Sequence, residues 1–358
     1  MEVLEYLKQI ENAGFEAYIV GGYVRDNILG IKTTDVDITT SATPQEICKI
    51  FDISKVDNLG SINIKKSDIN IDITTFRKES NYFKHKPKNV TYVDDLLTDL
   101  KRRDFTINTL CINSKGEIID MLGGLSDLEN KILKVVGRPK KKFREDPLRM
   151  MRALRFSIIY DLCIADKELE FILNNKKLFS EISYKRKKDE LGYILVSKNC
   201  IKGLNLLKSL NLTEALEIDF DEKITYVNDY IGMWSQINCS DGYQFSKLEL
   251  MRMNAIKSII EYGKIDENVL FKYGKYDALI AGEIMGIDRK KIDEIYDSMK
   301  IYSMDELDIS GDEIKKLLNI EASPKIKNIK KDLIKEILFG NLANTKKDIS
   351  KYIIKKWK

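Results

Sequence analysis

The 358-residue chain contains one histidine and five cysteines, and no apolar run in it is long enough to cross a bilayer. The single histidine, His85, excludes sites built on several histidines, such as an H-D phosphohydrolase centre. The cysteines are scattered without a C-x-x-C pair, which argues against zinc and disulfides and is typical of the reducing cytoplasm. The acidic, amphipathic N-terminus does not resemble a signal peptide. We therefore expect a cytoplasmic protein that does not bind membranes, and no protein partner is evident.

Positive charge is concentrated in three places, although the formal net charge is only +4. These places are Lys140–Lys142 with Arg144, Lys185–Lys188, and the lysine-rich end from Lys325 to Lys358. Lysine runs often cover a solvated helix face, but a stripe of them can also follow the phosphates of structured RNA. We favour the RNA interpretation because the motifs described next are suited to nucleotide chemistry.

Two aspartates one residue apart, Asp35 and Asp37, lie in the β-branched segment T-T-D-V-D-I-T-T. Because side chains alternate along a strand, both carboxylates are predicted to share one face. Paired carboxylates repel each other unless a cation lies between them, and Mg²⁺ prefers such hard oxygen ligands. The pair predicts metal-assisted phosphoryl or nucleotidyl transfer; a solvated turn is the alternative.

Two further segments bear on this prediction. Gly21 and Gly22 follow the apolar run Tyr18–Val20 and precede a short predicted helix, where bare N–H groups could bind a phosphate. A tight turn without a ligand is the simpler alternative. A second predicted strand, Asn70–Arg77, carries Asp72 out of phase with its isoleucines. Asp72 could bind metal or deprotonate a 3′-hydroxyl, or it could simply face solvent.

The pattern of apolar residues changes along the chain. Up to about residue 136, short β-rich segments alternate with helices. From Phe143 onward the spacing is almost wholly helical, as in residues 148–159, 201–210 and 314–318. We predict an α+β protein, with an N-terminal head built on a small mixed or antiparallel sheet, followed by all-α regions.

The string G-G-Y-V-R-D-N-I-L-G-I-K-T-T-D-V-D-I-T-T-S-A-T-P resembles the signature of class II tRNA nucleotidyltransferases. These are the bacterial-type CCA-adding enzymes of the polymerase-β-like nucleotidyltransferase superfamily. Three later motifs resemble the same family in the same order: R-R-D-F-T-I-N at 102–108, D-M-L-G-G at 120–124 and E-D-P-L-R-M-M-R-A-L-R-F at 145–156. Four ordered motifs make the resemblance specific.

The resemblance implies a layout and a chemistry. A catalytic nucleotidyltransferase head would span residues 1–137, a base-selecting neck 138–200, a helical body 201–300 and a tRNA-binding tail 301–358. Mg²⁺ on Asp35 and Asp37 would be the cofactor, and the two aspartates with Asp72 would be catalytic. The tRNA 3′ end would be the partner, with CTP and ATP as substrates, and the Gly21-Gly22 turn would bind nucleotide.

Asp146 and Arg149 lie three residues apart at a predicted helix start, on one helix face. The pairing edges of cytosine and adenine both present an amine beside an acceptor nitrogen, whereas guanine and uracil reverse that order. A carboxylate and a guanidinium could therefore accept C and A and reject G and U; a helix-capping ion pair is the alternative. Arg152 and Arg155 continue this face and could clamp the triphosphate.

Further site residues follow from the resemblance. Arg103, Asp104 and Asn108 would hold the ribose, although a buried Arg–Asp pair fixing the core is the alternative. Arg25 would bind phosphate, with Asp26 orienting it.

Two segments of the head resemble moving parts of the family. Gly123-Gly124 resembles the family's hinge, with a plain turn as the alternative. Residues 78–90, which show no periodicity, occupy the place of the family's flexible loop, which is needed for adding the final A. Two departures stand out: Asp72 replaces the usual glutamate, and Lys185-Arg186 stands where the family has an E-R pair.

The expected function is template-independent addition and repair of the tRNA 3′-terminal C-C-A, with release of pyrophosphate. Partial enzymes that add only C-C or only A are alternatives. A poly(A) polymerase is disfavoured because residues 58–64 lack the G-R-[RK]-F-like motif of that group. An inactive RNA-binding homologue is disfavoured by the intact Asp35, Asp37 and Arg149.

Overall fold

The computed structural model describes residues 2–53, 61–66, 68–83, 85–321 and 323–358. The chain forms two compact units, Met1–Glu217 and Ile218–Lys358. Among the described residues, no helix is long and apolar enough to cross a membrane. The division into head, neck, body and tail stays a prediction.

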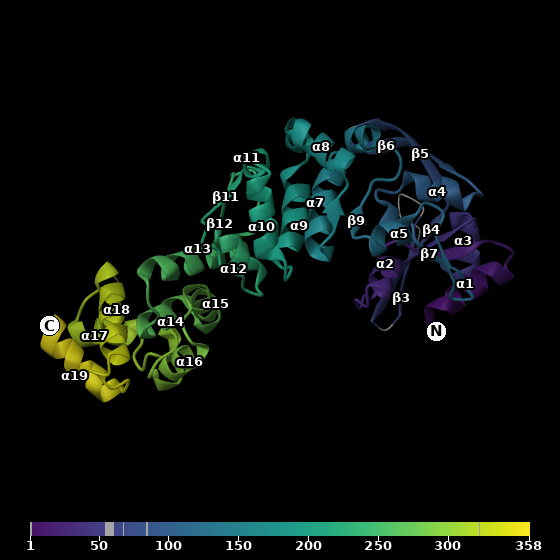
Figure 1. Ribbon diagram of the computed structural model, residues 1–358. Coiled ribbons are helices and arrows are strands. Elements are labelled where there is room, and N and C mark those ends of the chain that lie inside the picture. Colours follow the sequence, from purple (N-terminus) through teal and green to yellow (C-terminus); the bar gives the residue numbers. More distant parts are fainter. Residues whose placement is uncertain (1, 54–60, 67, 84, 322) are drawn as a thin grey trace. The chain divides into compact units, whose positions relative to one another are not determined.

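A six-stranded sheet forms the centre of the N-terminal part of the first unit, in the order β3-β4-β2-β1-β7-β8 (Figure 1). Strands β2 and β4 are parallel, and the other neighbours are antiparallel. This confirms the predicted small mixed sheet. The strands are β1 Ala17–Val20, β2 Asp35–Thr40, β3 Ile62–Lys66, β4 Ile69–Thr75, β7 Cys111–Ile112 and β8 Ile118–Ile119.

Strand β2 presents both aspartates on one face of this sheet. Val36 and Ile38 are buried while Asp35 and Asp37 are exposed, so the predicted alternation is confirmed. The parallel register pairs Asp37 with Asp72 on β4. Side chains at paired positions of adjacent strands project from the same face of the sheet. Asp35, Asp37 and Asp72 therefore lie on one face of β2 and β4.

The helices of the first unit cover the sheet and then continue the chain as a helical region. In Figure 1, α7, α9 and α10 lie side by side, in agreement with their contacts. The short parallel pair β9 Ile132–Leu133 and β10 Cys163–Ile164 connects the two parts. The helices are α1 Glu2–Asn12, α2 Gly22–Ile28, α3 Pro44–Phe51, α4 Leu96–Arg102, α5 Gly124–Glu129, α6 Pro139–Glu145, α7 Leu148–Tyr160, α8 Asp166–Asn174, α9 Tyr184–Leu195, α10 Cys200–Ser209 and α11 Thr213–Leu216, with 3₁₀ turns η1 Thr106–Asn108 and η2 Lys176–Glu181.

Helix α4 is fixed against the sheet by a small apolar cluster. Leu96 and Leu100 pack with Val20, Phe76 and Cys111, all buried. The Asp95 side chain begins the helix by accepting the N–H groups of residues 97 and 98. Helix α4 is thereby held against the sheet, which matters because residues 102–108 follow it directly.

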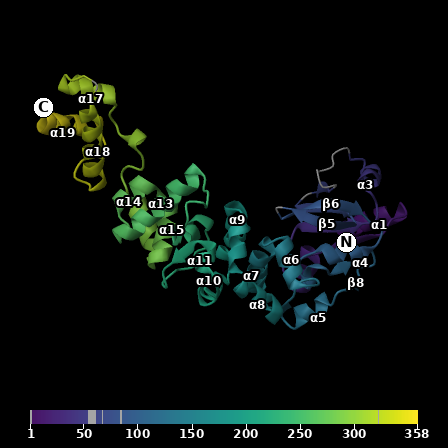
Figure 2. The same cartoon turned by 90° about the horizontal axis from the view of Figure 1, so that it is seen from above.

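Residues 78–90, expected as an aperiodic loop, instead form an antiparallel hairpin of β5 Arg77–Phe83 and β6 Lys86–Tyr92, coloured blue in Figure 2. The described residues of β5 alternate only between intermediate and exposed positions, so no apolar period marks the strand in the sequence. Lys84 lies outside the described residues. The imidazole of His85 lies 3.5 Å from the Glu181 carboxylate of η2.

The second unit is mainly helical, as predicted, but contains one short antiparallel pair, β11 Ile218–Phe220 with β12 Ile237–Cys239. Strands of three residues are too short to show a period in the sequence. The described helices are α12 Tyr230–Ser235, α13 Lys247–Tyr262, α14 Glu267–Tyr273, α15 Lys275–Met285, α16 Arg289–Ser298, α17 Gly311–Leu318, α18 Pro324–Leu338 and α19 Lys346–Trp357, with the 3₁₀ turn η3 Met304–Glu306.

Gly124 is packed too closely for any side chain. A Cβ there would lie 2.2 Å from the Thr106 carbonyl oxygen. We expect Gly124→Ala to lower the free energy of unfolding by about 1–3 kcal/mol, because α5 must move away from η1. Gly22→Ala is the control: its Cβ would meet only Arg25 at 3.7 Å, and we expect a change below about 0.5 kcal/mol. Equal effects of the two changes in urea unfolding would refute this packing argument.

Candidate active site

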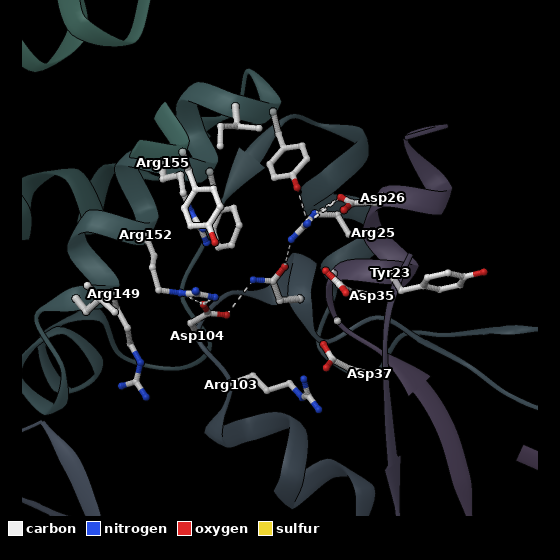
Figure 3. A pocket seen from close by; sticks show the side chains of 18 of the residues that line it. Tyr23, Arg25, Asp26, Asp35, Asp37, Arg103, Asp104, Arg149, Arg152 and Arg155 are labelled. Carbon is white, nitrogen blue, oxygen red and sulfur yellow. Dashed lines mark hydrogen bonds and ion pairs between the residues drawn. The ribbon is translucent and has the colours of Figure 1, made fainter. Parts of the chain in front are cut away.

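A cavity of about 700 Å³ in the first unit gathers twelve of the thirteen site residues expected from the sequence. Figure 3 shows Arg25, Asp35 and Asp37 on the side of the sheet and Arg149, Arg152 and Arg155 on helix α7 opposite, with Arg103 and Asp104 between them. Asp72 is the expected residue that does not line the cavity. The expected residues in the lining are Gly21, Gly22, Arg25, Asp35, Asp37, Arg103, Asp104, Asn108, Asp146, Arg149, Arg152 and Arg155.

The Asp37 carboxyl lies among several charged groups. Its side chain reaches solvent, but desolvation by the surrounding protein raises its pKa; the charge of Arg103 opposes this rise, and the charges of Asp72 and Asp35 add to it. A cation bound beside the pair would relieve the repulsion. Two carboxylates beside a nucleotide-sized cavity are a donor set that suits Mg²⁺ completed by waters and phosphates.

Gly21 brings the backbone against this pair. A Cβ at Gly21 would lie 3.6 Å from Asp37 Oδ2 and 3.5 Å from Arg103 Nη1, and its φ of +83° disfavours any other residue. Its own N–H donates to the Leu110 carbonyl at 3.2 Å, so the turn is anchored to the centre of the head.

Asp72 lies beside the pair and is engaged by a neighbouring amide. Its Oδ1 accepts a hydrogen bond from Asn63 Nδ2 at 2.8 Å. In the described ranges, no three Asp, Glu, His or Cys side chains come together as a metal-binding group. A catalytic role of Asp72 stays a prediction.

The Arg25 guanidinium is held on all of its nitrogens. It donates twice to Asp26 Oδ1, at 2.9 and 2.7 Å, once to Asn108 Oδ1 at 2.5 Å, and once to the Tyr160 hydroxyl at 2.5 Å. The orientation by Asp26 agrees with the expectation from the sequence. The partnership with Tyr160 of α7 was not foreseen, and it ties the sheet side of the cavity to the helical side.

Asp104 connects Asn108 to helix α7. It accepts from Asn108 Nδ2 at 2.9 Å and from Arg152 Nε at 2.7 Å. Burial alone would raise the pKa of Asp104, but the charge of Arg152 and these hydrogen bonds hold that pKa well below its usual value. The alternative of a buried Arg–Asp pair holds with other partners, since Arg103 contacts Asp99 at 3.3 Å and Asp104 pairs with Arg152.

Asp146 and Arg149 both face the cavity, but they do not pair with each other. Asp146 accepts from both terminal nitrogens of Arg186, at 3.3 and 2.9 Å. Arg149 Nη1 donates to Glu145 Oε2 at 3.2 Å and to the Lys142 carbonyl at 2.9 Å. The ion pair considered as an alternative is therefore wrong, but Asp146 does cap helix α7, because its Oδ1 accepts from the N–H of Leu148 at 3.1 Å.

Arg155 is buried beside Glu190, with 3.0 Å between Nε and Oε2 but without hydrogen-bond alignment. Its guanidinium also lies over the rings of Phe156 and Tyr193, at 4.5 and 4.9 Å. Burial lowers the pKa of Arg155, and the charge of Glu190 opposes this. Arg155 is therefore held in the cavity wall by the Glu190 carboxylate and two aromatic rings.

Sequence reasoning missed several lining residues. Arg186 and Tyr160 are the most consequential, because they hold Asp146 and Arg25. The only signal for Arg186 in the sequence was that Lys185-Arg186 stands where the family has an E-R pair. Nothing in the sequence linked Arg186 to Asp146, which lies 40 positions away.

Two lysines assigned to the RNA stripe are buried instead. Lys142 is 9% exposed and Lys187 is 1% exposed. Lys187 contacts Glu217 at 3.4 Å, and Lys142 binds main-chain carbonyls. The RNA interpretation is therefore wrong for these two side chains, since neither can reach a phosphate.

Comparisons with known proteins agree over nearly the whole chain. The family described as "Poly A polymerase head domain" matches residues 17–134, and "tRNA nucleotidyltransferase domain 2 putative" matches residues 233–353. The chain is 31% identical to the CCA-adding enzyme of Streptococcus uberis, over 99% of this chain and 96% of that one. It is 33% identical to the CCA-adding enzyme of Ligilactobacillus salivarius, over 96% and 94%.

A solved structure shares the fold. The Bacillus stearothermophilus CCA-adding enzyme in complex with CTP superposes with a TM-score of 0.87 and 25% identity, over 99% of this chain and 96% of that one. The Thermotoga maritima CCA-adding enzyme complexed with tRNA has a TM-score of 0.68 at 18% identity, a similarity of fold.

Proposed function

The chain belongs to the CCA-adding enzymes, a family of tRNA nucleotidyltransferases, and we propose that it builds and repairs the tRNA 3′-terminal C-C-A from CTP and ATP. Pyrophosphate is the second product. The observation that carries this proposal is the shared cavity, whose lining includes the aspartate pair together with Asp146 and Arg149. The residues proposed for nucleotidyl transfer and those proposed for base selection would thus line the same cavity.

The divalent metal would be Mg²⁺, held by Asp35 and Asp37. When bound, it would activate the tRNA 3′-hydroxyl and neutralise charge on the leaving pyrophosphate. Burial is the main cause of the raised pKa of Asp37, and the charges of Asp72 and Asp35 add to it; a bound cation would offset that repulsion, which supports this assignment.

Base selection would rest on Asp146 and Arg149. A carboxylate accepting from the exocyclic amine and a guanidinium donating to the ring nitrogen fit cytosine and adenine alike. Guanine or uracil would leave charged groups unpaired, at a cost of about 1–3 kcal/mol or more. Arg186 and Glu145 support this role, since they hold the two readers in fixed directions before a nucleotide arrives.

The sugar and phosphates would be held around these two centres. Arg103, Asp104 and Asn108 are proposed for the ribose. Arg25, Arg152 and Arg155, with the Gly21-Gly22 turn, are proposed for the triphosphate. The hydrogen bonds from Arg25 through Asn108 and Asp104 to Arg152 support a common framework for both groups.

The tRNA would dock on the helical regions by shape and phosphate contacts. The body (201–300) and tail (301–358) are proposed for this role, with the exposed lysines of α18 and α19 as candidates. Its tRNA substrate and its five free cysteines favour a cytoplasmic site of action.

Staged tRNA transcripts test complete C-C-A addition. Transcripts ending before the first C, after it, and after the second C are incubated with CTP, ATP or both. We expect CTP alone to extend the first two, ATP alone to extend only the third, and both nucleotides together to complete all three. EDTA should stop every addition, and excess Mg²⁺ should restore it.

Each rival gives a different pattern. A C-C-adding enzyme leaves the third transcript unchanged, and an A-adding enzyme extends only that one. A poly(A) polymerase extends all three with ATP alone. An inactive RNA-binding homologue extends none, and any of these patterns would overturn the proposal.

A further inference from the structure

Lys142 on helix α6 is a buried lysine whose three ammonium donors are all used. Its Nζ donates to the carbonyl oxygens of residues 101, 102 and 103, at 2.8, 3.0 and 3.1 Å. These carbonyls lie at the end of α4, where main-chain acceptors have no helical partner and the helix dipole is negative. The ammonium therefore caps α4 and fixes the start of the segment that carries Arg103 and Asp104 into the cavity.

The main chain of Lys142 reaches a second cavity residue. Its carbonyl oxygen accepts from Arg149 Nη1 at 2.9 Å. One residue thus holds the proposed ribose segment with its side chain and the proposed base reader with its backbone. Lys142 itself does not line the cavity, whereas Arg103 and Arg149, which it contacts, do.

Burying the charged ammonium of Lys142 costs free energy. Burial, with the nearby charge of Arg149, lowers the pKa of Lys142 to about 8. A buried ammonium is tolerated only when its donors are satisfied, and here three carbonyls satisfy them. An apolar side chain would fill the same space without that cost, so packing alone does not account for a lysine here.

We propose that Lys142 is a positioning residue that sets the ribose-binding segment, residues 102–104, against the base reader Arg149. The inference rests on the proposed function. Loss of the ammonium frees three carbonyls and lets Arg103 and Asp104 shift, so discrimination against 2′-deoxynucleotides weakens. Base discrimination persists, because the carbonyl that holds Arg149 is part of the main chain and survives any substitution.

The test separates sugar from base discrimination in Lys142→Met, which keeps the length of the side chain and removes the charge. The ratios of kcat/KM for CTP over 2′-deoxy-CTP and for CTP over UTP are measured on a transcript lacking C-C-A. We expect the sugar ratio to fall about tenfold, within the cost of unmade buried hydrogen bonds, and the base ratio to stay within about threefold.

Lys141→Met is the matched control. Its side chain is 75% exposed and lies 3.8 Å from Glu145, so neither ratio should change. Ratios are independent of the folded fraction, so a merely destabilised protein would leave both at their wild-type values. A sugar ratio unchanged in Lys142→Met overturns the inference, as does an equal fall in both ratios.

If Lys142→Met does not fold, the sugar ratio is measured in Lys142→Gln instead. Its amide leaves at least one carbonyl without a donor, and we expect the sugar ratio to fall about threefold. An unchanged ratio in that variant overturns the inference. Failure of the proposed function is distinct, because the wild-type protein would then give one of the rival patterns on the staged transcripts.

Discussion

Asp35→Ala is expected to lower the rate of nucleotide addition at least about a thousandfold, because metal assistance supplies several kcal/mol to the reaction. Asp35 projects from the exposed face of β2 into the cavity beside Asp37, and the change removes one of the two proposed metal donors. The affinity for tRNA should stay within about threefold, since RNA contacts are proposed for the helical regions. Single-turnover addition of C to a transcript lacking C-C-A measures the first effect, and filter binding measures the second.

Asp94→Ala is the control for this experiment. Asp94 is an exposed aspartate of the same unit and does not line the cavity, so both rate and affinity should be unchanged. Addition by Asp35→Ala within tenfold of wild type would refute the metal role. A large loss of tRNA affinity would assign Asp35 to RNA binding instead.

Arg149→Ala is expected to lower kcat/KM for both CTP and ATP by roughly 5–150-fold, the range for an unmade hydrogen bond to a charged group. Selectivity should fall as well, because Asp146 alone cannot test the ring nitrogen next to the amine. Misincorporation of U and G should therefore rise relative to C and A. The measurement is kcat/KM for each of the four nucleotides on staged transcripts.

Arg138→Ala is the matched control, since Arg138 is exposed at the start of helix α6 and lies outside the cavity. It should leave all four values unchanged. If Arg149→Ala lowered the use of all four nucleotides by the same factor, Arg149 would serve general nucleotide binding, and the base-selection account would fail.

The features that were predictable from the sequence depend on periods and local chemistry. Alternation along β2 placed Asp35 and Asp37 on one face, and the structure confirms this because Val36 and Ile38 fill the core between them. Helix α7 was predictable from its 3.6-residue spacing, and the turn at Gly21 from its glycine pair. Each of these signals is contained within a dozen residues.

The features that were not predictable are pairings between distant residues. Arg152 binds Asp104 across 48 positions, and Arg186 binds Asp146 across 40. Charged side chains can pair in many ways, and the choice is made by how the helices pack. The burial of Lys142 was not predictable for the same reason. It depends on how α6 packs against α4 and not on the neighbouring residues in the run Lys140–Lys142.

The hairpin was missed for a different reason. The described residues of β5 are at most half-buried, so the sequence there carries no alternation, although the strands pair at six positions from Arg77↔Tyr92 to Phe83↔Lys86. Tyr82 of this hairpin places its ring 5.7 Å from the Arg149 guanidinium, and its hydroxyl donates to Glu79 at 2.8 Å. The segment that looked least structured thus borders the proposed base reader.

The central claim is that the protein alone, without a nucleic-acid template, chooses C, C and then A. It is tested most directly by incubating a transcript that lacks C-C-A with equal concentrations of all four ribonucleotides and sequencing the 3′ ends. The account predicts that C-C-A is added and that extension then stops. Ends in C-C, runs of A, or frequent G and U at the added positions would contradict it.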